Sequence, residues 1–187
     1  MIESWPTDKY RTIVIDPPWP LGFIGKYSRH GARALMPYRT MTVDAIAELP
    51  VGELAQPGAH LWLWTTNRML PVSFEIMRAW GFTYLNTVTW VKSSGIGAYF
   101  INTTQHCLFG YFGRCDFPLE RYFKTHFHSD VKRGDHSRKP EKFYWLVKQI
   151  SPAPRIDLFN RRELEGFDGW GDESPPRRQI SLFDQEA

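Results

Sequence analysis

Long apolar runs are absent from this chain of 187 residues. None approaches the roughly 18 to 20 residues that a membrane-spanning helix needs. Cysteine is scarce too: the two residues imply no disulfide framework and fit a reducing compartment. The first ten residues lack the basic-then-apolar pattern of a secretion signal. Together these absences predict a cytoplasmic protein with no membrane partner.

Two cofactor signatures are also missing. No GxGxxG fingerprint follows a strand, which argues against a nicotinamide-dependent enzyme. The six histidines and two cysteines match no standard zinc spacing, and Cys107 lies in an apolar run. We therefore predict no metal site, and we interpret the histidines of residues 114–138 as loop residues near phosphates.

The net charge of +3 fits a polyanionic partner but is too small to indicate one by itself. Basic residues gather in 26–39 and 114–142, where they alternate with Tyr and His. Such runs are usually solvated surface, but two of them in one small domain favour contact with phosphates. The candidate substrate contacts in these segments are Lys26, Tyr27, Arg29, Tyr38, Arg39, Lys132 and Arg133.

Apolar side chains are plentiful, and their spacing predicts regular structure. The composition, 42% hydrophobic and 16% aromatic, is that of a globular domain. Most aromatic rings are expected in the core, with a minority available to stack on bases. Apolar, β-branched runs predict strands over 10–15, 59–65, 83–91, 105–112 and 155–159, and helical periodicity predicts helices over 43–48, 71–80 and 140–150.

Strands and helices alternate along the chain, which predicts an α/β fold with a mostly parallel sheet and helices on both faces. We expect a domain over residues 1–173 and a flexible tail over 174–187. Residues 20–40 are interpreted as a long loop and 93–97 as a turn, and one or two further strands are expected near 117–123.

The most specific feature is Asp16-Pro17-Pro18-Trp19, directly after the first predicted strand. A Pro-Pro pair cannot donate ladder hydrogen bonds, so the strand must end there. A polar residue at the carboxyl end of such a strand lies where α/β sheets place their chemistry. The motif resembles that of the MT-A70-like adenine-N6 methyltransferases, and the resemblance runs from about Thr12 to Glu173. A plainer alternative makes Asp16 a turn residue and Trp19 a core ring.

A second block resembles the cofactor half of the same family: His136 to Pro140, then Leu158 to Arg161, then Trp170 to Glu173. It follows the catalytic half in the chain, so the resemblance implies a circularly permuted Rossmann-like class I methyltransferase fold. It also implies S-adenosyl-L-methionine as cofactor, with contacts from Ile15, Asp16, Lys139, Phe159, Asn160, Arg161, Asp172 and Glu173. The family often has a small residue where Asn160 stands and an amide near Asp172.

The resemblance implies a role for each residue of the motif. An adenine amine is a poor nucleophile, because its lone pair is delocalised into the ring. Asp16 would accept one N6 hydrogen and the carbonyl of Pro17, stiffened by Pro18, the other, while Trp19 stacks on the base. The rate would come mainly from positioning two bound substrates. The base must first leave the duplex or already be single-stranded.

Asn102 and Gln105 fall in the region that lines the substrate side in relatives, although Glu is frequent where Gln105 stands. The sequence therefore predicts a methyltransferase acting on the N6 amine of adenine in DNA. An RNA enzyme and a catalytically idle nucleic-acid-binding subunit stay open as alternatives. A cytosine-N4 enzyme does too, although those more often have Ser at the first motif position. Gln179 to Phe183 resembles a sliding-clamp docking peptide, or is simply a frayed tail.

Overall fold

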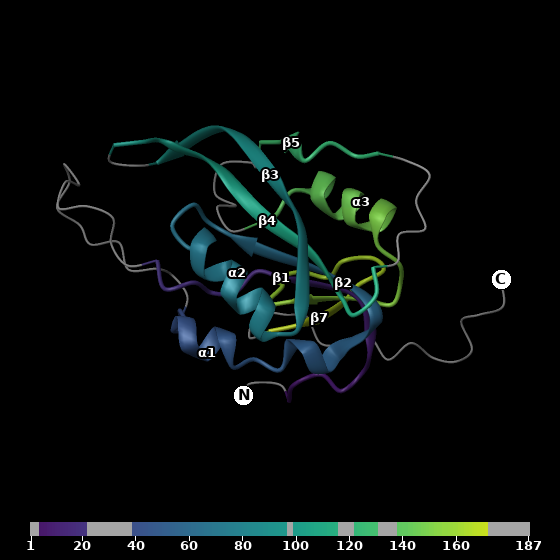
Figure 1. Ribbon diagram of the computed structural model, residues 1–187. Coiled ribbons are helices and arrows are strands. Elements are labelled where there is room, and N and C mark those ends of the chain that lie inside the picture. The colour runs from purple at the N-terminus through teal and green to yellow at the C-terminus, as the bar shows by residue number, and fades with distance from the viewer. Residues whose placement is uncertain (1–3, 22–38, 97–98, 116–121, 131–137, 172–187) are drawn as a thin grey trace.

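The computed structural model describes residues 4–21, 39–96, 99–115, 122–130 and 138–171. They form one seven-stranded sheet in the order β5-β3-β4-β2-β1-β6-β7 (Figure 1). Three α-helices and one short 3-10 helix accompany it in this part of the chain. The strands are β1 (Tyr10–Ile15), β2 (Ala55–Thr65), β3 (Phe82–Ile96), β4 (Asn102–Phe112), β5 (His126–His128), β6 (Arg155–Leu158) and β7 (Asp168–Trp170).

The strand β1 is central and pairs in parallel with β2 on one side and β6 on the other. The pairs β3–β5 and β6–β7 are parallel as well, whereas β4 is antiparallel to both of its neighbours. Among the described strands, β4 alone therefore runs against the rest. We call the edge at which the other strands end the carboxyl edge of the sheet.

Helices cover both faces, as the sequence predicted. The residues of β1 alternate between two buried clusters, with Ile13 and Ile15 in one and Val14 in the other. Helices α1 (Val43–Ala47) and α2 (Leu70–Ala79), with the 3-10 helix (Val51–Leu54), pack on the first cluster. Helix α3 (Glu141–Ile150) packs on the second, across the sheet in Figure 1. Burial on both faces explains why the central strands read as continuous apolar runs.

The helices form where capping and periodicity predicted them. The hydroxyl of Thr42 accepts a hydrogen bond from the Ala45 N–H and so caps α1. Pro71 lies in the first turn of α2, and Gly81 follows that helix at a φ of 83°, which favours glycine. Pro140 directly precedes α3.

One prediction about the β3–β4 region was wrong. Residues 93–97 were expected to form a turn, but β3 continues through Ile96, which pairs with Asn102 of β4. Gly95 permits this because a Cβ there would overlap the backbone of Asn102. The tip that follows exposes the side chains of Tyr99, Phe100 and Ile101.

The shortest strands were not predicted. The strand expected near 117–123 falls mostly outside the described residues, and β5 forms instead at His126–His128, beside the end of β3. Strand β7 has only three residues, and one of them is Gly169. In the part of the chain that the structure describes, no helix has both the length and the apolarity to cross a bilayer.

Candidate functional site

Asp16 lies at the carboxyl edge, where β1 leaves the sheet. Its N–H donates to the carbonyl of Leu158 in β6 at 3.5 Å, and its side chain is 34% exposed. Lys139 Nζ lies 2.7 Å from Asp16 Oδ2, on a lysine side chain that is only 11% exposed. The tip of the central strand therefore presents a carboxylate paired with a nearly buried ammonium.

The ammonium of Lys139 has two further neighbours. It lies 3.5 Å from Gln105 Oε1 and 4.8 Å from the ring centroid of Trp64, which is buried in β2. The resemblance assigned Lys139 to the cofactor and Gln105 to the substrate. In the structure the two side chains meet, and both lie on the Asp16 side of the site.

The segment after Asp16 folds into consecutive tight turns. The Pro17 carbonyl accepts from the Trp19 N–H at 2.8 Å, and the Trp19 carbonyl accepts from the Leu21 N–H at 2.8 Å. The Pro18 carbonyl accepts from the Met41 N–H at 2.9 Å. The Pro17 carbonyl, expected to receive an amine hydrogen, thus already holds one donor. A carbonyl oxygen has two lone pairs, so it retains capacity for a second.

Trp19 does not have the stacking role expected of it. Its ring is 4% exposed and packs in the cluster beneath α1 and α2. Its Nε1 donates to the carbonyl of Trp64 at 3.0 Å. An indole buried to this extent has no face to offer a base. The plainer alternative is correct for this residue: the ring anchors the turn to β2 and so fixes the position of Asp16.

The expected cofactor contacts begin at the ends of β6 and β7. Phe159 has a φ of 63°, and its N–H donates to the Trp170 carbonyl at 2.5 Å. Gly171 has a φ of 149°, and a Cβ there would lie 2.9 Å from the Cα of Phe159. The two strand ends therefore approach closely, with glycine on one side. Backbone free of side chains at the carboxyl ends of parallel strands is a surface on which a nucleoside can lie.

Three other residues expected to contact the cofactor differ in how exposed their side chains are. Ile15 is fully buried, so its side chain belongs to the core and only its backbone borders the edge. Asn160 is 8% exposed, and its Nδ2 donates to the Arg162 carbonyl at 2.9 Å. Its side chain therefore turns into the loop that it stabilises. Arg161 is exposed.

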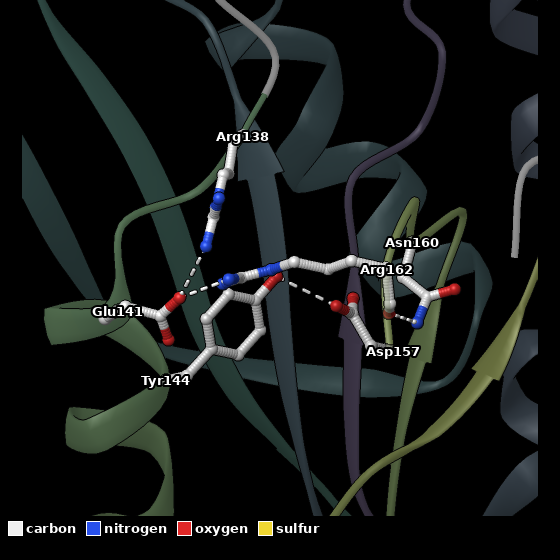
Figure 2. Close-up of polar contacts among 6 residues, drawn as sticks. All are labelled: Arg138, Glu141, Tyr144, Asp157, Asn160 and Arg162. Carbon is white, nitrogen blue, oxygen red and sulfur yellow. Dashed lines mark hydrogen bonds and ion pairs between the residues drawn. The ribbon is translucent and has the colours of Figure 1, made fainter. Parts of the chain in front are cut away.

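A polar brace, defined as Arg138, Glu141, Tyr144, Asp157 and Arg162, connects α3 with the loop after β6 (Figure 2). Glu141 Oε1 accepts from Arg162 Nη1 and, at 3.0 Å, from Arg138 Nη2. The guanidinium of Arg162 lies 5.3 Å from the ring centroid of Tyr144, whose hydroxyl donates to Asp157 Oδ2 at 2.8 Å. The brace holds the segment before α3 against the loop after β6, where cofactor contacts were expected.

Burial and hydrogen bonding shift the pKa values of three residues of this brace. It raises the pKa of Asp157 to about 7, against the lowering effect of the hydrogen bond from Tyr144, and the charge of Asp16 raises it further. Burial also raises the pKa of Tyr144 well above its usual value, and Asp157 adds to that shift. The hydrogen bond from Arg162 lowers the pKa of Glu141.

The structure shows a second polar cluster that sequence reasoning missed except for one member. Asn67 Nδ2 donates to Asn102 Oδ1 at 3.1 Å and to Thr104 Oγ1 at 3.2 Å. His106 Nε2 lies 2.7 Å from Asn67 Oδ1, and His106 Nδ1 lies 3.0 Å from Thr89 Oγ1. We call these five residues the Asn67 network. Asn67 follows β2 as Asp16 follows β1, so the same rule about strand ends could have found it.

Several predicted contacts lie outside the described residues, and Arg39 is described and exposed. Those outside are Lys26, Tyr27, Arg29, Tyr38, Lys132, Arg133, Asp172, Glu173 and the segment Gln179–Phe183. Within the described ranges, no group of three His, Cys, Asp or Glu side chains could hold a metal ion. Burial raises the pKa of the Cys107 thiol well above its usual value.

The fold and the site together define the class of protein. A sheet in which, among the described strands, β4 alone is reversed, with an acidic residue at the tip of its central strand, is the class I methyltransferase fold. The strands β6 and β7, at whose ends the cofactor contacts were expected, follow the other described strands in the chain, which is the circularly permuted order that the resemblance implied. The chain belongs to the MT-A70 family of adenine-N6 methyltransferases: the MT-A70 family model matches residues 10–173.

Individual relatives are distant. The type II methyltransferase M.MunI from Mycoplasma sp. is 26% identical over 196 residues, which cover 92% of this chain and 81% of the relative. A putative N(6)-adenosine-methyltransferase MT-A70-like from Medicago truncatula is 29% identical, covering 82% of this chain but 24% of its own length. Human METTL3, the N(6)-adenosine-methyltransferase catalytic subunit, is 26% identical, covering 82% and 26%. The chain thus spans about a quarter of these last two relatives.

Proposed function

We propose that this protein is an S-adenosyl-L-methionine-dependent methyltransferase that modifies the N6 amine of adenine in a nucleic acid, with DNA as the first substrate to test. The observation that carries the proposal is the partly exposed carboxylate of Asp16, paired with Lys139 at 2.7 Å at the end of the central strand. Lys139 occupies Oδ2, so Oδ1 is the oxygen proposed to accept an amine hydrogen.

The chemistry follows from three fixed groups. Asp16 Oδ1 and the Pro17 carbonyl accept the two hydrogens of the amine, and the lone pair then points away from both acceptors. Lys139 keeps the carboxylate in position through its contact with Oδ2. Trp19 fixes the turn by its hydrogen bond to the Trp64 carbonyl. These groups are in place before the substrate arrives, which is the preorganisation that lowers a barrier.

The residues present fit the proposed cofactor. The close backbone approach of Phe159 and Gly171 is the proposed seat of a nucleoside, and Asp172 and Glu173 follow directly in the sequence as proposed acceptors for ribose hydroxyls. When bound, the cofactor supplies an electrophilic methyl group on its sulfonium sulfur. The brace connects the segment that contains Lys139 with the loop that contains Asn160. We propose that this connection fixes the position of the cofactor relative to the adenine, because the rate of methyl transfer depends on that position.

DNA is placed before RNA because the match with the type II methyltransferase extends over most of both sequences, 92% of this chain and 81% of the relative. The N(6)-adenosine-methyltransferases are about four times longer than the matched part. An RNA substrate stays the second candidate, and an idle subunit the third. We also propose that the protein acts in the cytoplasm and that its segment Gln179–Phe183 docks on a sliding clamp.

The test is the variant Asp16→Asn, which keeps the shape of the side chain and removes its charge. We expect methylation of adenine N6 in an oligonucleotide to fall by about a hundredfold or more, the scale of losing one preorganised group. Cofactor affinity in a calorimetric titration should fall less, by about tenfold at most, because Asp16 is only one of several expected cofactor contacts. The matched control is Asp168→Asn, whose carboxylate binds the Tyr10 hydroxyl at 2.8 Å at the opposite edge.

Each alternative has its own outcome in this experiment. Asp16→Asn activity within twofold of the parent chain would show that the carboxylate is not the amine acceptor. A preference for matched RNA oligonucleotides would overturn the DNA assignment. An absence of heat when cofactor is titrated into the parent chain would favour the idle subunit.

A further inference from the structure

Lys92 is a half-buried cation in β3. Its ammonium lies 5.3 Å from the ring centroid of Trp90, two residues earlier in the same strand. Within the described ranges no carboxylate forms an ion pair with it, and the Asp130 carboxylate instead accepts from the Ser93 N–H at 3.0 Å. A charge held partly out of water usually has an opposite charge beside it, because desolvation disfavours the ionised form. Among the described side chains, Lys92 has no such counter-charge.

A second ammonium makes the position of Lys92 less favourable still. Burial lowers the pKa of Lys92, and the charge of Lys139 lowers it further. Lys139 lies 4.8 Å from the ring centroid of Trp64, and the rings of Trp64 and Trp90 meet edge to face with their centroids 6.2 Å apart. Asp16 pairs with Lys139 at 2.7 Å and so offsets only one of the two positive charges. The two lysines and Asp16 together therefore leave a net positive charge beside two buried tryptophans.

The strand order places Lys92 on the substrate side of the site. Strand β3 runs in the same direction as β1, so Lys92, in its last third, lies toward the carboxyl edge. Trp90 pairs with Gln105 of β4, and cross-strand partners share a face of the sheet, so Lys92 lies on the face of Gln105. Strands β6 and β7, where cofactor contacts are expected, lie on the other side of β1. An anion bound by Lys92 would thus belong to the substrate.

On the basis of the proposed function, we propose that Lys92 binds one of the two phosphates that flank the target adenosine while the adenine is held at Asp16. Every nucleotide of a nucleic acid carries such a phosphate next to its sugar, whatever the base sequence. An ammonium acts on a phosphate as a point charge, so a lysine suits a contact that fixes position without reading sequence. Partial burial strengthens the attraction, because less water screens it. The substrate then supplies the counter-charge that Lys92 lacks.

The first test is Lys92→Met, which removes the charge and keeps a long apolar side chain against Trp90. It should raise the KM for an oligonucleotide by about tenfold and leave kcat within about twofold, because the phosphate contact is the same before and during methyl transfer. Lys92→Arg keeps the charge and should stay within about threefold of the parent KM. Unchanged KM in Lys92→Met would overturn the proposal.

The matched control for the loss of one positive charge is Lys148→Met. Lys148 lies in the last turn of α3 and pairs with Glu165 at 3.7 Å, away from the carboxyl edge. This variant should keep the parent KM. An equal rise of KM in both variants would show that only the total charge of the protein matters, and it would overturn the proposal.

Two further measurements separate phosphate binding from support of the fold. The slope of log KM against log salt concentration should become shallower by about one in Lys92→Met, since one phosphate contact is lost. The melting temperature should equal or exceed that of the parent chain, because the variant removes the repulsion between Lys92 and Lys139. A lower melting temperature with an unchanged salt slope would assign Lys92 to the fold and overturn the proposal.

The next experiment identifies the phosphate. Oligonucleotides with one neutral methylphosphonate at the 5′ or the 3′ linkage of the target adenosine are assayed with the parent chain and Lys92→Met. At one of the two linkages the replacement should raise KM for the parent chain and have little further effect on the variant, because both changes remove the same contact. Additive effects at both linkages would overturn the phosphate assignment.

The other anion that could reach this region is the carboxylate of the cofactor. S-adenosylhomocysteine carries that carboxylate and methylthioadenosine lacks it, so both are titrated into the parent chain and Lys92→Met by calorimetry. Each should bind the two chains equally well. Weaker binding of S-adenosylhomocysteine alone to the variant would assign Lys92 to the cofactor and overturn the proposal. Failure of the parent chain to methylate any nucleic acid would instead refute the proposed function, whereas methylation with unaltered KM in Lys92→Met refutes the Lys92 contact alone.

Discussion

At the scale of single residues, the carboxyl of Asp157 links the protonation of the site to the stability of the fold. It is 2% exposed and accepts a hydrogen bond from Tyr144, and burial raises its pKa to about 7. An unfolded aspartate titrates near 4. Between these values the folded protein holds a proton that the unfolded chain releases. The stabilisation is therefore complete below about pH 4 and is lost as the pH rises through 7.

The variant Asp157→Asn should remove this dependence. Its amide stays neutral and can still accept from Tyr144, so its stability relative to the parent chain should improve by a few kcal/mol between pH 4 and pH 8. Denaturant unfolding at four pH values measures the difference. Tyr144→Phe is the companion variant: the hydrogen bond from Tyr144 lowers the pKa of Asp157, so its loss should raise that pKa and extend the decline in stability to higher pH, with the onset near pH 4 unchanged. A pH-independent difference between Asp157→Asn and the parent chain would contradict the raised pKa.

At the scale of elements, β7 and the loop after β6 meet at one close contact. A Cβ on Gly169 would lie 2.6 Å from Asn160 Nδ2 and 2.8 Å from Oδ1, and this carboxamide also donates to the Arg162 carbonyl. The amide is the part that must yield, and moving it breaks the bond that shapes the loop. We therefore expect the packing of β7 to affect the position of the proposed cofactor contacts in the loop after β6.

Gly169→Ala should lower the free energy of unfolding by about 1–3 kcal/mol and weaken cofactor binding several-fold. Denaturant unfolding and calorimetric titration measure the two effects. Gly166→Ala is the control, because its φ of 77° strains alanine while a Cβ there meets only the end of Lys148. It should lose stability but keep cofactor affinity. The prediction fails if Gly169→Ala is as harmful in an Asn160→Ala background as in the parent chain.

The elements that pack against the core along their whole length could be predicted from the sequence, and the shortest elements could not. The central strand β1 and helix α3 were predicted nearly to the residue, because their apolar patterns meet a core on fixed sides. Strand β7 has three residues, too few for a pattern. The end of β3 was mistaken for a turn because Ser93, Ser94 and Gly95 are turn residues locally, whereas pairing with β4 decides their conformation.

In the candidate site too, some features could be predicted from the sequence and others depend on contacts between distant segments. The motif gave the position of Asp16, since a strand that meets two prolines must end. It could not give the direction of the Trp19 ring, which depends on the space beside β2. The pairing of Lys139 with Asp16 and the contacts of His106 join segments far apart in the chain. No local pattern encodes such contacts, because the strand order creates them.

At the scale of the whole molecule, the sheet cannot be completed without its last strands. One side of β1 pairs with β2, and the other side pairs only with β6. A chain that ends at residue 173 should keep the cooperative unfolding of the parent chain, within about 1 kcal/mol, because it retains every helix and strand that the described residues form. A chain that ends at residue 154 should lack a cooperative transition. Circular dichroism during heating tests both, and a cooperative transition in the shorter chain would show that β6 is dispensable.

The permuted order has a consequence for synthesis on the ribosome. The central strand emerges before the other described strands, yet the partner for one of its sides, Arg155–Leu158, is translated only after most of them. Until then an apolar strand exposes a row of unpaired peptide groups, the kind of edge that recruits strands from other molecules. Nascent chains of this protein should therefore depend on chaperones that cover open strands, more than those of a relative in which the cofactor half is made first.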